Sequence, residues 1–134
     1  DHVESVPEGS GNWLSALKDR ALSTALALIH REPQRNWTVP ELAKEACLSR
    51  SAFADRFTQT LGEPPLTYLT RHRMRLAARH LGHSALSVSK VADMVGYASE
   101  AAFSQAFKRE YGCSPSAWRQ QQAANGPDVA EEAA

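Results

Sequence analysis

The sequence predicts an all-α fold of about seven helices, in which two helix-turn-helix subdomains are joined by a central linker helix. Three observations lead to this prediction. Apolar residues recur at helical spacing along most of the chain, and no stretch alternates as a β-strand does. The segment over about residues 39–62 is repeated over about residues 88–112. A basic segment, residues 65–81, lies between the copies and contains four arginines and no acidic residue.

The repeat can be followed residue by residue. From Ser49 onward the offset is fifty positions, and the matched pairs are Ser49 with Ser99, Ala52 with Ala102, Phe53 with Phe103, Phe57 with Phe107, Gly62 with Gly112, Pro65 with Pro115 and Tyr68 with Trp118. Upstream the offset is forty-nine positions, and Val39, Leu42, Ala43 and Cys47 match Val88, Val91, Ala92 and Gly96. Internal repeats usually indicate a solenoid. Only two copies, separated by a basic helix, fit a tandem module with a rigid spacer better.

Composition divides the 134 residues into three parts. Residues 1–12 consist largely of Gly, Ser, Pro and acids and are predicted to be a flexible linker. Residues 13–119 carry the helical pattern, so we expect them to form the folded domain. Residues 120–134 are rich in Gln, Ala and acids and are predicted to be a flexible acidic tail. Because the chain begins with Asp1 rather than Met, we expect it to be a fragment of a longer protein.

Two predicted helices precede the first turn. One covers residues 13–32 and ends there, because Pro33 disfavours the helical conformation of the residue before it. The next begins at a capping box, for which Thr38 and Glu41 have the required spacing.

Serine caps are predicted at three further helix starts, because a serine side chain can accept a hydrogen bond from a backbone N–H of the first turn. These are Ser49 before residues 50–61, Ser87 before residues 88–95 and Ser99 before residues 100–111. The turn of each motif needs a left-handed residue. Gly96 fits there, whereas Cys47 carries a Cβ that would cost about 1 kcal/mol.

The linker helix is predicted over residues 65–81. Pro65 suits its first turn, where a missing N–H costs nothing, and Gly82 is expected to stop it. Its basic residues are Arg71, Arg73, Arg75 and Arg79.

The formal net charge of zero hides an uneven distribution. All fifteen Lys and Arg lie between Lys18 and Arg119, whereas six of the fifteen acids lie outside that span. The foldable part therefore has a formal charge of +6. A cationic body with acidic ends favours a polyanionic partner.

Cysteine usage and hydropathy indicate in which cellular compartment the chain is expected. Cys47 and Cys113 lie far apart without a C-x-x-C pattern, which indicates reduced intracellular thiols. No apolar run is long enough to cross a membrane and no signal-peptide pattern is present, so no membrane partner is expected.

Two segments now carry a family resemblance. SRSAFADRFTQTLGEPPLTYLTRHRM (residues 49–74) and VADMVGYASEAAFSQAFKREYGCSPSAWR (residues 91–119) resemble the DNA-binding domain of the AraC/XylS family of bacterial transcription regulators. The resemblance covers about residues 13–119. The opening NWLSALKDRALSTALALIHREP (residues 12–33) is similar to members whose N-terminal effector domain is a cupin-like barrel.

The resemblance implies a cytoplasmic bacterial regulator that binds double-stranded DNA and has RNA polymerase as a further candidate partner. The N-terminal effector domain of the full-length protein would be missing here, and the fragment would be monomeric.

The family reads bases with the exposed faces of both second helices. Carried over to this sequence, the implied DNA-binding residues are Arg50, Ser51, Ala54, Asp55, Thr58, Glu100, Ala101, Ser104, Gln105 and Lys108. The periodicity agrees, because Phe53 and Phe57, with their counterparts in the second copy, point inward and leave these residues outside.

The first copy departs from the family pattern. Asp55 stands where some members have arginine, and Ala54 and Ala101 can contact only a thymine methyl group. In the second copy, Gln105 can pair with adenine and Glu100 can accept from cytosine N4. Asp55 could instead be a repelled or water-mediated neighbour of DNA, paired with an arginine, and Glu100 could simply stabilise a helix N-terminus.

Phosphate contacts are assigned to the first residues of the recognition segments and to the linker helix. The candidates are Ser49, Arg71, Arg75, Arg79 and Ser99. The arginines could also form an ordinary solvated face, and Arg73 could be held within the protein.

Catalysis and metal binding find no support in the pattern. His72, His80 and His83 lack an acidic or cysteine partner at ligand spacing, and no histidine base is placed beside Cys47. We therefore expect no enzymatic activity, no cofactor and no metal. The alternative to DNA binding is a helical interaction module that docks an acidic partner such as an RNA polymerase subunit. A protein dock has no need of a fifty-residue repeat.

Overall fold

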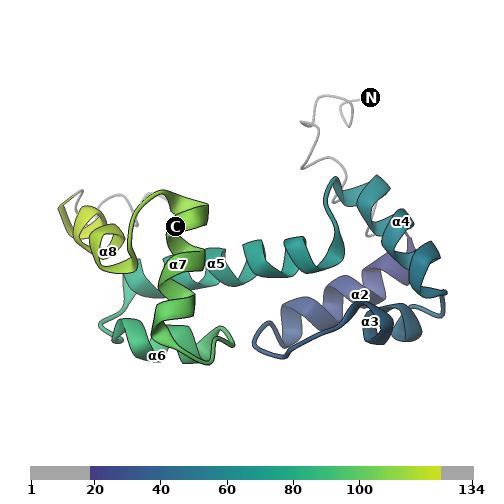
Figure 1. Ribbon diagram of the computed structural model, residues 1–134, viewed down its shortest axis with the longest axis horizontal. Helices are drawn as coiled ribbons and strands as arrows, with labels where there is room; N and C mark the ends of the chain where they lie inside the picture. The colour runs from purple at the N-terminus through teal and green to yellow at the C-terminus, as the bar shows by residue number, and fades with distance from the viewer. Residues whose placement is uncertain (1–18, 125–134) are drawn as a thin grey trace. The chain divides into compact units, whose positions relative to one another are not determined.

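The computed structural model describes residues 19–124, and no strand occurs within this range (Figure 1). Its helices are α2 (Arg20–Arg31), α3 (Val39–Glu45), α4 (Arg50–Leu61), α5 (Pro65–His83), α6 (Val88–Met94), α7 (Glu100–Tyr111) and α8 (Pro115–Ala124). The chain divides into two compact units, Asp1–Thr70 and Arg71–Ala134, and α5 begins in the first unit and ends in the second. The predicted all-α class is confirmed.

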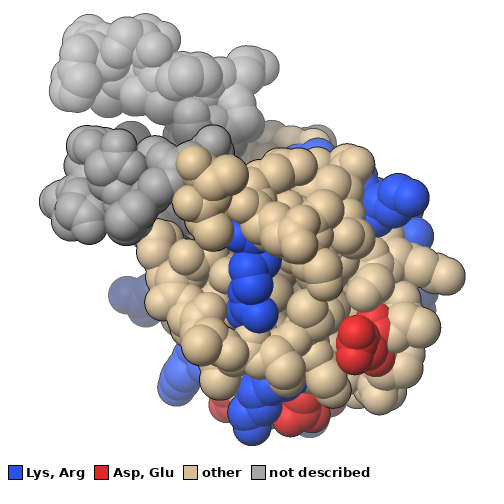
Figure 2. All heavy atoms as spheres, turned by 90° about the vertical axis from the view of Figure 1, so that its left-hand side faces the viewer, with Lys and Arg blue, Asp and Glu red and all other residues tan. Residues whose placement is uncertain are grey.

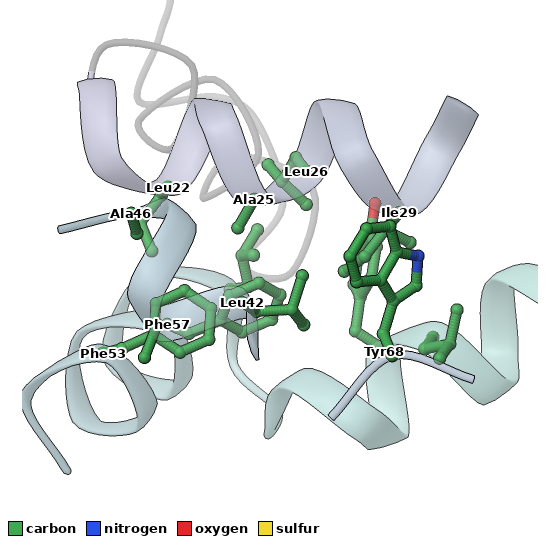
Figure 3. Packing of buried hydrophobic residues seen from close by; sticks show 13 residues of the cluster. Leu22, Ala25, Leu26, Ile29, Leu42, Ala46, Phe53, Phe57 and Tyr68 are labelled. Carbon is green, nitrogen blue, oxygen red and sulfur yellow. The ribbon is translucent and has the colours of Figure 1, made fainter. Parts of the chain in front are cut away.

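The first unit has its core between α2, α3, α4 and the start of α5. The inward face of α2 supplies Leu22, Ala25, Leu26 and Ile29, which pack with Leu42, Phe53, Phe57 and Tyr68 (Figure 3). Phe57 meets Tyr68 edge to face, with ring centroids 5.6 Å apart. Trp37 is buried as well, and its indole N–H donates to the Glu32 carbonyl oxygen at 3.0 Å. These aromatic residues therefore hold the helices of the first unit together.

The second unit repeats this arrangement. Phe103 and Phe107 are fully buried, and Phe107 meets Trp118 edge to face with ring centroids 6.0 Å apart. The indole N–H of Trp118 donates to the Ala78 carbonyl oxygen at 3.2 Å, which fastens α8 to α5. The aromatic pairs predicted from the repeat thus occupy matching places in two separate cores.

The predicted helix caps are confirmed. Thr38 Oγ1 accepts from the N–H of Glu41 at 3.2 Å, and Glu41 Oε1 accepts from the N–H of Thr38 at 3.1 Å, which completes the capping box. Ser49, Ser87 and Ser99 each accept from the N–H three residues later, at 3.2, 3.0 and 3.1 Å. Each cap fixes where its helix begins.

Two predicted helix ends are wrong. Within the described residues, α2 begins at Arg20 because Asp19 is its N-cap and accepts from the N–H of Leu22 at 3.2 Å; residues 13–18 lie outside this range. Gly82 does not stop α5, which continues to His83. Gly82 lies near Gln122 of α8, and a Cβ on it would be 3.4 Å from Cγ of Gln122, an ordinary van der Waals contact.

The C-terminal boundary also differs from the expectation. Residues 120–124, expected to begin the tail, are the last turns of α8. Gln and Ala are good helix formers, which favours the continuation of α8 through these residues. The expected linker, residues 1–12, and the tail after Ala124 lie outside the described residues. Among the helices that are described, none is long and apolar enough to cross a membrane.

Candidate nucleic-acid interface

The two helix-turn-helix motifs have the same backbone hydrogen bonds. In the first turn, the N–H of Leu48 donates to the Ala43 oxygen at 3.0 Å and that of Cys47 to the Lys44 oxygen at 3.0 Å. The matching bonds of the second turn, Tyr97 to Ala92 and Gly96 to Asp93, are 2.9 and 3.1 Å long. The turns therefore present α4 and α7 relative to α3 and α6 through the same local geometry.

Both turns contain the predicted left-handed residue. Gly96 has φ 93°, and Cys47 has φ 62°, the only positive φ of a non-glycine residue among those described. Cys47 is exposed, so its side chain gains no packing that would offset the backbone strain.

Helix α4 presents most of its implied DNA-binding residues to solvent. Phe53, Phe57 and Leu61 are buried on the opposite side. Arg50, Ser51, Asp55 and Thr58 are exposed, whereas Ala54 is half-buried at the edge of the core. The exposed set can reach a partner without any rearrangement of the core.

Helix α7 has the same division. Phe103, Ala106 and Phe107 are buried. Glu100, Ala101, Gln105 and Lys108 are exposed, and Ser104 is half-buried like its counterpart Ala54. These implied residues thus place one amide, one carboxylate and one ammonium group on α7 over about two and a half turns.

The candidate phosphate contacts fall into two kinds. Ser49 and Ser99 use their hydroxyl oxygens as cap acceptors, which leaves each O–H able to donate. Arg75 and Arg79 are exposed on α5. Arg71 is half exposed, and its Nε lies 3.5 Å from Oε2 of Glu110 on α7. An exposed ion pair contributes at most about 1 kcal/mol, so a phosphate can compete for Arg71.

Arg73 lies inside the protein, as the alternative interpretation of the linker helix had it. It is 9% exposed, and its guanidinium carbon lies 5.7 Å from the ring centroid of Tyr97, the turn residue of the second motif. Burial lowers the pKa of Arg73 from its ordinary value, and the charge interaction and hydrogen bond with Tyr97 oppose that shift. Arg73 therefore ties α5 to the second turn instead of reaching solvent.

A family model described as a helix-turn-helix domain matches residues 42–121, which span both motifs. The chain belongs to the AraC family of helix-turn-helix domains.

Named relatives and solved structures agree with this assignment. The chain is 48% identical over 121 residues to the HTH-type transcriptional regulator AlkR of Acinetobacter baylyi, covering 90% of this chain and 39% of the relative. It is 47% identical over 118 residues to a putative AraC-like transcription regulator of Streptomyces lividans, covering 88% of this chain and 39% of the relative. The chain thus spans about two fifths of the length of these relatives.

One solved structure similar to this AraC-family chain contains DNA. It is the DNA-binding domain of AdpA in complex with a target DNA, with a TM-score of 0.76 and 33% identity. The match covers 81% of this chain and 97% of that one.

Two exposed residues of this AraC-family domain escaped the sequence interpretation. Gln59 and Arg109 lie four residues after Asp55 and Gln105, hence one turn further along the same helix faces, and both are exposed. The i, i+4 spacing alone could have found them. Arg109 adds a second cation to the exposed face of α7.

Arg119 of α8 was also missed, and its role is internal. Its Nε donates to the Leu81 oxygen at 2.9 Å, and its Nη2 donates to the Ser84 oxygen at 3.3 Å and to the Leu86 oxygen. These bonds hold the end of α5 and the segment that leads to Ser87, the cap of α6. Arg119 therefore positions the start of the second motif. Among the described residues, no group of three or more His, Cys, Asp or Glu is arranged to hold a metal ion.

Proposed function

We propose that the chain binds double-stranded DNA sequence-specifically, as the DNA-binding part of a bacterial transcription regulator. The observation that carries this proposal is the repeated helix-turn-helix, in which α4 and α7 each bury an aromatic face and expose a polar one. The similarity to a DNA-binding domain in complex with its target DNA supports it.

The proposed binding mode places α4 and α7 in successive major grooves. A continuous helix of 19 residues such as α5 is about 28 Å long. Successive major grooves on one side of a duplex are about 34 Å apart. These lengths are of the same order, so α5 is suited to act as the spacer between two readers.

Base discrimination is assigned mainly to α7. Gln105 is proposed to pair with adenine through N6 and N7, and Glu100 to accept from cytosine N4. On α4, Arg50 and Ser51 are the proposed contacts. Asp55 carries a charge that phosphate repels, so it is proposed to lie next to a base edge or a bridging water.

A selection of bound sequences from random DNA, followed by gel shifts with competitor duplex, tests this proposal. We expect one preferred asymmetric site of about two helical turns, occupied by one chain without any small molecule. Equal affinity for the selected and scrambled duplexes would contradict sequence-specific binding. Two chains on one short selected duplex in sedimentation would contradict the tandem mode.

For the whole regulator, we propose work in the bacterial cytoplasm, with RNA polymerase as a second partner. The support is the resemblance to transcription regulators whose length exceeds the matched part. Recruitment of purified polymerase to a promoter that carries the selected site is the measurement, and polymerase occupancy unaffected by the full-length protein would contradict it.

A further inference from the structure

The two units differ sharply in charge. In the described part of the first unit, residues 19–70, six Lys and Arg face six Asp and Glu, so the formal charge is zero. In the described part of the second unit, residues 71–124, eight Lys and Arg face three acids, which gives +5. With all residues of the chain counted, the values are −2 and +2. The cationic character of the domain therefore belongs to its second unit.

The difference is concentrated beside the proposed base readers. On α7, Lys108 and Arg109 are exposed on either side of the line that runs along the helix through Gln105. The walls of a major groove are phosphate strands on both sides of an inserted helix, so cations at these positions can contact both. The matched residues of α4 are Thr58 and Gln59, which flank the acidic Asp55.

The second unit has further exposed cations on α5 and α6. Lys90 lies in the first turn of α6, the helix that crosses the backbone in a helix-turn-helix complex, and its counterpart in the first copy is Glu41. Arg75 and Arg79 lie on the part of α5 that belongs to this unit. Figure 2 faces the end of the molecule where α6, α7 and α8 lie and shows several Lys and Arg side chains with fewer Asp and Glu.

Two of the six described cations of the first unit lie near its own carboxylates, as Arg71 of the second unit lies near Glu110. Arg56 Nε lies 3.1 Å from Oδ2 of Asp19, and an Nη of Arg35 lies 3.6 Å from Oε2 of Glu41. Arg35 also lies over the Trp37 ring, 4.0 Å from its centroid. These pairs are exposed and weak, as that of Arg71 with Glu110 is, so the difference between the units rests on their formal charge.

We infer that the second unit alone holds the phosphate backbone of duplex DNA of any sequence, and that the first unit engages only at sites whose bases it fits. This inference rests on the proposed function. On scrambled DNA the chain is then attached through Arg75, Arg79, Lys90, Lys108 and Arg109, and the neutral first unit adds almost no counterion release.

The salt dependence of affinity gives the measurable consequence. Each phosphate neutralised contributes about −0.9 to the slope of log K against log salt. The first unit offers mainly Arg50 as a new phosphate contact. The slope on the selected site should therefore be steeper than that on scrambled duplex by no more than about one.

The test uses fluorescence anisotropy of the whole chain on selected and scrambled duplexes between about 50 and 200 mM salt. Lys108→Thr/Arg109→Gln gives the second unit the residues of the first. It should weaken binding to scrambled duplex by about tenfold or more and make the slope shallower by about two. The matched control, Arg31→Gln/Lys44→Gln, removes two exposed cations of the first unit and should change that slope by less than about 0.5.

Thermal unfolding of each variant checks that the folded state is retained, since all four side chains are exposed. The inference is overturned if the control pair weakens binding to scrambled duplex as much as Lys108→Thr/Arg109→Gln does. It is also overturned if Arg50→Gln costs as much affinity for that duplex per removed charge. In either case the proposed DNA-binding function is unaffected. If the unchanged chain has no salt-dependent affinity for either duplex, the proposed function itself fails, and the inference with it.

Discussion

Replacing Cys47 by glycine should stabilise the first unit. Cys47 has φ 62°, where the Cβ of an L-residue costs about 1–2 kcal/mol. Glycine removes this cost but adds about 0.4–1 kcal/mol of unfolded-chain entropy. Because Cys47 is exposed, no packing is lost. The net gain in the free energy of unfolding should therefore be about 0.5–1 kcal/mol.

Controls separate backbone strain from other effects. Cys47→Ala keeps a Cβ at the strained position and should change stability little. Gly62→Ala and Gly112→Ala place a Cβ at φ 85° and 81°, with no heavy atom within 4 Å of it. Each should therefore lose about 0.5–1 kcal/mol through the backbone alone, the opposite sign to Cys47→Gly.

Urea unfolding followed by circular dichroism is the assay, with thermal melting as a check, since about 1 kcal/mol shifts the Tm of a small domain by about 4–8 °C. If the units unfold in separate transitions, Cys47→Gly and Gly62→Ala should move one transition and Gly112→Ala the other. Equal stabilisation by Cys47→Ala and Cys47→Gly would refute the strain argument, because alanine retains the Cβ.

Three further outcomes are expected. On the selected site the log–log salt slope should be near −5, since about six phosphates can be neutralised by the exposed cations Arg50, Arg75, Arg79, Lys90, Lys108 and Arg109. A slope shallower than about −2 would exclude linker-helix phosphate contacts. Gln105→Ala should cost about 1–3 kcal/mol on the selected site and relax the choice at one base pair; an equal loss on scrambled duplex, measured in parallel, would remove Gln105 from the readers. Arg119→Ala should lower the free energy of unfolding of the second unit by about 2–3 kcal/mol in urea titrations, and Arg119→Lys should recover only part, because an ammonium cannot match the guanidinium fork.

Local chemistry made much of the fold predictable. The serine caps and the capping box depend on residues three apart, so their spacing in the sequence fixes them. The positive φ of Cys47 and Gly96 follows from the shared turn. Periodicity likewise separates the buried from the exposed positions of α4 and α7, which is why the candidate readers could be named.

Features that depend on contacts distant in sequence could not be predicted. Arg119 bonds carbonyl groups that are 33 to 38 residues away, and no local pattern identifies an arginine as their donor. The ion pair of Arg71 with Glu110 needs α5 and α7 in place before either residue is a candidate partner.

The two motifs are copies in their backbones and cores but not in their outward residues. Buried positions such as Phe53 and Phe103 are the same because packing tolerates few alternatives. Exposed positions exchange charge, as Arg50 with Glu100 and Glu41 with Lys90 do. Two identical readers would favour a directly repeated site. Divergent faces on a common frame instead favour two different half-sites. The unequal charge of the units lets the second unit hold any duplex, whereas the first unit engages only where its own half-site fits.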